Sequence, residues 1–191
     1  MNRSIAGSLE SLDQIMTFIE GLTTTEYQYI AAPLFDSSIG QHLRHIVDLY
    51  LALIGSTSAQ NSSLSTPDIC NINYDVRRRG AGIETDKDTG LAELSNIRQW
   101  LTNVAEHDIN KEALVSTEVS LTAQQSEVFT SSFGRELCFA SSHLTHHLAI
   151  MAAIAKMAGK EVDPYLGLAP ATATFTREQE SNKQDIRTCA H

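Results

Sequence analysis

The segment SSHLTHHLAIMAAIAKMAG, residues 141–159, places three histidines at the start of an otherwise apolar stretch. His143 and His147 are four residues apart, so on a helix they lie on one face. At about 100° per residue, this face also carries Phe139, Ile150 and Ile154. The histidine pair should therefore point into the protein core. Burying an imidazole without a partner costs roughly 1–3 kcal/mol, so the segment predicts a core helix that also forms part of a site.

Helical periodicity extends to three further segments, which define the expected fold. They cover residues 8–22, 38–55 and 85–107, and the histidine helix covers residues 132–157. Ser38 and Gln41 are spaced as in a capping box, and Gly55 is the expected stop of the second helix. The polar residues 56–85 predict a long crossover between the second and third helices. Alternating residues in 113–130 predict a small β-hairpin before the fourth helix. The expected fold is all-α, a four-helix bundle with this crossover and hairpin.

Size and composition fit one globular domain. The chain has 191 residues, of which 42% are hydrophobic and 19% charged. Residues 1–170 are expected to form the bundle domain. Residues 171–191 are polar and lack periodic apolar positions, which predicts a C-terminal tail that is mobile or forms an arm.

Charge and cysteine content narrow the expected partners and location. The net charge of -9 disfavours broad binding to nucleic acid, because an acidic chain repels phosphate backbones. Three scattered cysteines do not form a disulfide framework and suit a reducing compartment. The N-terminal stretch lacks the apolar region of a signal peptide, and no consecutive apolar run approaches the ~20 residues that span a bilayer. We therefore expect a cytoplasmic protein without a nucleic-acid or membrane partner.

The second helix supplies candidates for a third imidazole. Histidines at i and i+4, such as His143 and His147, are a common chelating arrangement for a divalent first-row metal. His42 and His45 lie three residues apart on the second helix, and one of them would complete a three-histidine set with open coordination positions. The apolar stripe of this helix lies closer to His42 than to His45, so periodicity alone favours His42. The contrasting interpretation is a metal-free core in which hydrogen bonds satisfy the imidazoles.

Charged residues near the histidines have both a functional and a structural interpretation. Arg77 and Arg79 in the crossover suit a clamp for a carboxylate or phosphate. They also suit a loop tied down by pairs with Asp75, Glu84 or Asp86. Glu136 lies seven residues before His143 and could orient a ligand or act as a base on metal-bound water. It could equally interact with the helix dipole. Asp48, three residues after His45, is a candidate of the same kind as Glu136.

The two histidine motifs resemble a known family. SIGQHLRHIVDLY (residues 38–50) and HLTHHLAI (residues 143–150) are similar to motifs of the DinB/YfiT-like superfamily of metalloenzymes. In that superfamily a histidine follows a helix-initial serine by seven residues, and the fourth helix carries HxxxH. This pattern matches Ser38 with His45 and implies His45, His143 and His147 as metal ligands. His42 and His146 become candidates for contacting these ligands or the substrate.

The resemblance covers about residues 5–168, and further segments point to a bacterial subgroup. These segments are YDVRRRGAGIETD, SSFGRELCFASSHLTHH and YLGLAPAT. The resemblance implies a four-helix bundle, a bound divalent ion such as Zn or Ni, and a homodimer. It also implies either thiol S-transfer, with a low-molecular-weight thiol, or metal-dependent hydrolysis.

The leading hypothesis is therefore a metal-dependent enzyme acting on a small molecule. In this hypothesis the metal activates a water or a thiol, and Glu136, Arg77 and Arg79 are the candidate catalytic residues. The alternative is a dimeric module that binds a metal or ligand without turnover. An open coordination position beside a cavity would distinguish the enzyme from the module.

Overall fold

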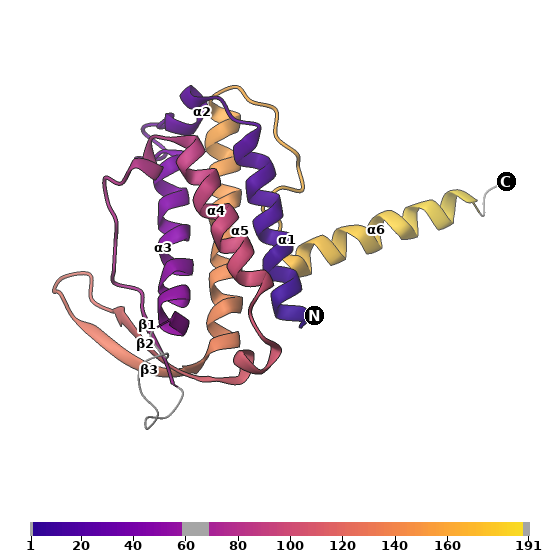
Figure 1. Ribbon diagram of the computed structural model, residues 1–191. Coiled ribbons are helices and arrows are strands. Elements are labelled where there is room, and N and C mark those ends of the chain that lie inside the picture. Colours follow the sequence, from indigo (N-terminus) through magenta and orange to yellow (C-terminus); the bar gives the residue numbers. More distant parts are fainter. Residues whose placement is uncertain (1, 59–68, 189–191) are drawn as a thin grey trace.

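The computed structural model describes residues 2–58 and 69–188, and four long helices form its body (Figure 1). These helices are α1 (Arg3–Glu20), α3 (Ile39–Ser58), α4 (Lys87–Thr102) and α5 (Phe133–Met157). α5 packs against α1 and α3, and α4 contacts the same two helices from the other side, which closes a four-helix bundle. Each long helix falls on a predicted segment. The expected stop at Gly55 is wrong, because α3 continues to Ser58.

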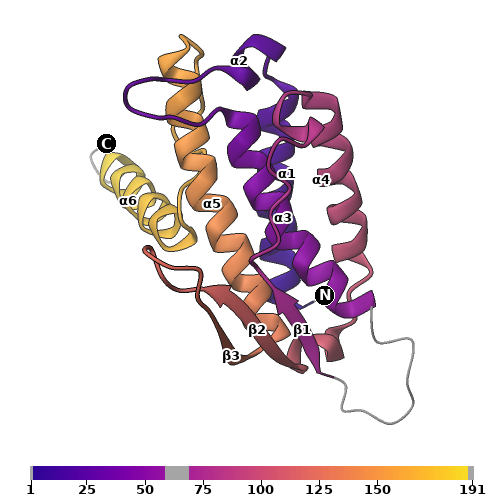
Figure 2. The same ribbon diagram turned by 90° about the vertical axis from the view of Figure 1, so that its left-hand side faces the viewer.

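A small sheet lies at the end of the bundle where α5 begins (Figure 2). It contains β1 (Cys70–Asn73), β2 (Glu112–Glu118) and β3 (Ser126–Ser132), in the order β1-β2-β3. β2 and β3 form the predicted hairpin, and β1 pairs with β2 in parallel, with Cys70 opposite Ala113. The mostly helical structure is roughly consistent with the expected all-α bundle. The strand β1 was not predicted, because four residues are too few for alternation to reveal a strand. Residues 59–68 of the predicted crossover lie outside the described residues.

Shorter helical elements surround the bundle. They are α2 (Thr24–Gln28) and the 3₁₀ turns η2 (Gly82–Glu84) and η3 (Glu106–Asn110). The predicted polar tail contains a long helix, α6 (Pro170–Thr188), which projects from the bundle in both views (Figures 1 and 2). Because its sequence lacks an apolar stripe, this helix does not pack along the bundle. The sequence analysis expected a polar tail or arm here, but it did not predict that the segment is helical.

α5 is a largely apolar helix and supplies a large part of the core. Its buried residues include Leu137, Leu144, Leu148, Met151 and Ile154. By length and mean hydropathy α5 could cross a membrane, which the count of consecutive apolar residues did not indicate. Half of its most apolar window is buried within this chain. Its apolar character is thus accounted for by packing in the bundle.

A close approach between η2 and the start of α3 sets the position of the crossover. Tyr27 is fully buried, and its hydroxyl donates a hydrogen bond to the Ile83 carbonyl at 2.6 Å. Gly40 faces this turn, where a methyl group would overlap the Glu84 carbonyl oxygen and lie 2.7 Å from the Tyr27 ring. Glycine at position 40 therefore lets η2 lie directly against α3, beside the helical turn that carries the histidines.

We predict that Gly40→Ala destabilises the protein by about 1–3 kcal/mol, because backbone atoms of η2 must move to admit the methyl group. Gly55→Ala is the matched control on the same helix. A methyl group there meets nothing within 4 Å, so this change should be neutral or stabilising by up to ~1 kcal/mol. Urea unfolding of both variants measures the difference. Equal stability of the two variants would contradict the proposed close approach.

Candidate metal centre

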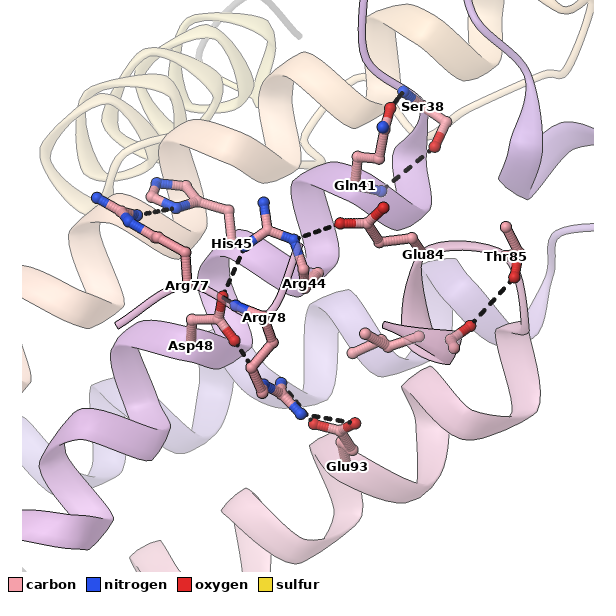
Figure 3. A network of polar contacts seen from close by, with 12 residues as sticks. Ser38, Gln41, Arg44, His45, Asp48, Arg77, Arg78, Glu84, Thr85 and Glu93 are labelled. Carbon is pink, nitrogen blue, oxygen red and sulfur yellow. Dashed lines mark hydrogen bonds and ion pairs between the residues drawn. The ribbon is translucent and has the colours of Figure 1, made fainter. Parts of the chain in front are cut away.

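The site lies between α3 and α5, where five imidazoles meet. α3 begins with the predicted capping box: the Ser38 amide donates to Gln41 Oε1 at 2.9 Å, and the Gln41 amide donates to Ser38 Oγ at 3.3 Å (Figure 3). This cap fixes the first turn of α3 and hence the direction of the following histidines. α3 provides His42 and His45, and α5 provides His143, His146 and His147.

His45, His143 and His147 form the tightest group of potential metal ligands. One nitrogen from each ring lies within 4.8 Å of the other two. The Nε2 atoms of His45 and His143 are 2.9 Å apart, and the rings of His143 and His147 have centroids 4.5 Å apart. Three neutral imidazoles at such spacing suit Zn and several other divalent ions. The donors present therefore fit a divalent metal.

His42 and His146 border this group. His42 Nδ1 lies 3.0 Å from His147 Nδ1, while its buried Nε2 has no hydrogen-bond partner. His146 is exposed, with its ring centroid 5.4 Å from that of His147. The structure thus brings all five predicted histidines together. Geometry places His45 rather than His42 in the three-membered group, although the apolar stripe of α3 favoured His42.

Burial keeps the clustered imidazoles neutral. Desolvation, followed by the nearby charge of His143, lowers the pKa of His45 from 6.5 to about 4. Desolvation and the neighbouring histidines lower the pKa of His147 to about 3. The pKa values of His42 and His143 are also lowered, mainly by burial. Near neutral pH the lone pairs are therefore free of protons, as metal binding requires.

Arg77 contacts the outer side of His45 (Figure 3). Its NH1 group lies 2.8 Å from His45 Nδ1. An arginine can only donate hydrogen bonds, so Nδ1 accepts and the ring proton is on Nε2. A histidine that binds metal through Nε2 carries its proton on Nδ1 and usually donates it to a carboxylate or carbonyl. Metal binding through His45 Nε2 would therefore move this proton to Nδ1 and release Arg77.

Arg78, which the sequence analysis did not single out, anchors the crossover to the bundle. Its Nε donates to Asp48 Oδ1 at 2.7 Å, and its two terminal nitrogens donate to Glu93 of α4 (Figure 3). Arg44 completes the network through Asp48 Oδ2 at 2.6 Å and an ion pair with Glu84. Asp48 thus holds the crossover and makes no hydrogen bond to His45. Its predicted role beside the metal ligands stays a prediction, and the structure adds an anchoring role.

The predicted pairs of Arg77 and Arg79 with carboxylates are wrong. Asp75 accepts from the Glu118 amide and the Ser126 hydroxyl, and Asp86 caps α4. Glu84 pairs with Arg44. Among the described residues, neither Arg77 nor Arg79 has a carboxylate partner. A loop tied down by arginine was therefore correctly expected, but Arg78 is the arginine that ties it.

Arg79 borders a cavity of about 490 Å³ beside the histidines. His42, His45 and His147 form one wall of the cavity, and Gln41 and Glu84 also contribute to its lining. The volume lies in the range usual for small-molecule sites. Two of the three candidate metal ligands therefore face a space that could hold a substrate.

Glu136 lies two helical turns from the histidines and is engaged elsewhere. Its buried carboxylate accepts hydrogen bonds from Tyr74 at 2.9 Å, Ser131 at 2.6 Å and Arg135 at 2.9 Å. These bonds join the crossover and β3 to the first turn of α5. The structure does not bring Glu136 together with the cluster, so its predicted catalytic role stays a prediction.

Comparison with known proteins identifies the family. The family model described as the DinB superfamily matches residues 10–151. This chain belongs to the DinB superfamily. The match includes both histidine helices up to Met151, and the three-histidine cluster is compatible with the metal-associated character of DinB proteins.

A curated relative matches part of the chain. FK506-binding protein 5 from Rhizopus delemar is 30% identical over 108 residues, which are 56% of this chain and 28% of that protein. The chain therefore spans less than a third of that relative. No solved structure matches the chain significantly.

The lowered histidine pKa values predict a specific pH dependence for the metal-free protein. Between about pH 6.5 and 4 the unfolded chain binds more protons than the folded chain at His45 and His147. The free energy of unfolding should therefore fall as the pH decreases through this window. A group that is fully protonated in the unfolded chain and fully neutral in the folded chain would change the free energy of unfolding by roughly 1.4 kcal/mol per pH unit. The slope for each of these histidines should be smaller, because the imidazoles are only partly buried.

Urea unfolding at pH 7.0, 6.0 and 5.0 measures this slope. His147→Asn should reduce it, and His107→Asn, at a side chain that is 79% exposed, should leave it unchanged. A stability that does not vary with pH, or a slope that His147→Asn does not alter, would contradict neutral burial of the cluster.

Proposed function

We propose that this DinB protein is a metal-dependent enzyme acting on a small molecule, with His45, His143 and His147 holding a divalent ion. Zn and Ni are the first candidates. When bound, such an ion would lower the pKa of a water or thiol and so supply a nucleophile. The tight group of three neutral imidazoles supports this proposal.

The cavity beside the cluster is the observation that carries the catalytic proposal. A catalytic ion needs an open coordination position next to a space for substrate, whereas a structural ion is enclosed by four protein ligands. His42 and Arg79 line this cavity together with His45 and His147. Recruitment of His42 as a fourth ligand would instead favour the alternative, a metal- or ligand-binding dimeric module without turnover.

Two reaction classes fit this arrangement: S-transfer from a low-molecular-weight thiol to an electrophile, and hydrolysis. In both, the three histidines would hold the ion while the cavity orients the substrate. His42 offers an unpartnered Nε2 to a bound molecule, and Arg77 lies against His45 in the metal-free protein. We also propose a cytoplasmic homodimer without a nucleic-acid or membrane partner. The acidic net charge supports the absence of a nucleic-acid partner, the scattered cysteines support a reducing compartment, and the family membership supports the homodimer.

Metal content tests the ligand assignment. We predict near-stoichiometric Zn or Ni in tag-free protein supplied with these ions, and a loss of at least tenfold in affinity for each of His45→Ala, His143→Ala and His147→Ala. His146→Ala and His42→Ala are matched controls from the same two helices and should retain the ion. Mass spectrometry of the purified proteins measures the stoichiometry.

Two outcomes would contradict the ligand assignment. One is a wild-type protein that binds none of several divalent ions. The other is a protein that loses its ion in His42→Ala but keeps it in His45→Ala. If the ion binds as predicted, assays of thiol transfer and ester or amide hydrolysis should show turnover that disappears on chelation and returns with the ion. Turnover that chelation leaves unchanged would contradict metal dependence.

A further inference from the structure

The three consecutive arginines of the crossover have three different environments. Arg78 is bound to Asp48 and Glu93, so its charge is already compensated. Arg77 faces the neutral imidazole of His45. Arg79 makes no hydrogen bond or ion pair with any described residue and lines the cavity beside the histidines. Exposed arginines without a partner are common on protein surfaces. Arg79 differs from them because it lies at the cavity beside the histidines.

The anchoring of Arg78 explains this position. Besides its side-chain bonds, Arg78 donates its backbone amide to Asp48 Oδ2 at 3.2 Å, which fixes the crossover against α3. Gly80 follows with a φ of +76°, so the chain turns immediately after Arg79. Gly80 itself lines the cavity. Arg79 is therefore held at the rim of the cavity between an anchored residue and a tight turn.

The local charge favours an anion despite the acidic chain. The charged residues that line the cavity are Arg44, Arg79 and Glu84, two positive and one negative, in a chain of net charge -9. Glu84 is bound to Arg44. Arg79 also lines the cavity, and its guanidinium has no partner among the described residues. The clustered histidines add no negative charge.

We infer that the cavity binds a small molecule carrying a carboxylate or phosphate group, and that Arg79 is the residue that selects for this anionic group. A free guanidinium fork binds two oxygens of a carboxylate or a phosphate in a bidentate pair. Carboxylate is the preferred class, because its single negative charge matches the one guanidinium that lines the cavity without a partner among the described residues. Gln41 lines the same cavity, and its Nε2 supplies a second donor, since its Oε1 is bound to the Ser38 amide. The inference rests on the proposed function, because it names the substrate class of the same site.

Anion binding to the metal-free protein tests this inference without relying on turnover. Sodium acetate and inorganic phosphate are titrated separately into ¹⁵N-labelled protein at constant ionic strength, and the Gly80 amide and arginine Nε–Hε signals are followed by NMR. We expect saturable acetate binding on the order of millimolar, which corresponds to ~4 kcal/mol. Arg79→Gln should weaken it about tenfold. Arg79→Lys should weaken it less, because lysine keeps the charge but lacks the fork.

Arg98→Gln is the matched control, because Arg98 pairs with Asp13 away from the cavity. This variant should bind acetate as the wild type does. Tighter binding of phosphate than acetate, with the same dependence on Arg79, would support the inference and assign a phosphoryl group. No saturable shift with either anion, or equal affinity in wild type and Arg79→Gln, would overturn it.

Divalent-ion binding, measured on separate portions of the same wild-type and variant preparations, separates the two proposals. Protein that binds no divalent ion but binds acetate through Arg79 would contradict the metalloenzyme and support the anion site. Protein that binds the ion through His45, His143 and His147 but shows no anion binding dependent on Arg79 would overturn this inference alone.

Discussion

The carboxylate of Asp48 is the contact on which the arrangement of the site depends. It is 7% exposed and accepts from Arg44 on its own helix and from Arg78 of the crossover. A buried charge is tolerated only when its partners compensate for the lost hydration. Asp48 therefore ties the crossover to α3 one turn after His45. This connection places Arg77 against His45 and Arg79 at the cavity, so the buried Asp48 carboxylate positions the residues around the histidine cluster.

The histidine cluster follows a related physical rule. Four partly buried imidazoles face one another across α3 and α5, and burial lowers their pKa values, so they remain neutral. Neighbouring neutral imidazoles can form a hydrogen bond with each other through one ring nitrogen each. His42 Nε2 nevertheless has no hydrogen-bond partner. A divalent ion held by His45, His143 and His147 would accept three of the neighbouring lone pairs at once. The same polar burial that weakens a metal-free core thus favours a metal-bound one.

Periodicity revealed the bundle and the pair His143 and His147, because a buried helix face repeats its apolar residues regularly. Periodicity favoured His42 over His45, because the apolar stripe of α3 lies closer to His42. The spacing from Ser38 that the family resemblance implies favoured His45, which the three-histidine group contains. Arg78 was missed because its partners Asp48 and Glu93 are distant in sequence. Nothing in the sequence distinguishes it from the neighbouring arginines at positions 77 and 79. The contacts of Glu136 with Tyr74 and Ser131 likewise depend on the tertiary fold. The short strand β1 and the helix α6 were missed because their local sequence signals are weak.

X-ray absorption spectroscopy of protein loaded with one equivalent of Zn tests the central claim most directly. The account predicts three imidazole nitrogens at about 2.0–2.1 Å, with one or two further light atoms that are not imidazole. The imidazole number should fall to two in His45→Ala and stay at three in His42→Ala. A site with four imidazoles, with sulfur ligands, or with the same spectrum in wild type and His45→Ala would contradict an open three-histidine centre.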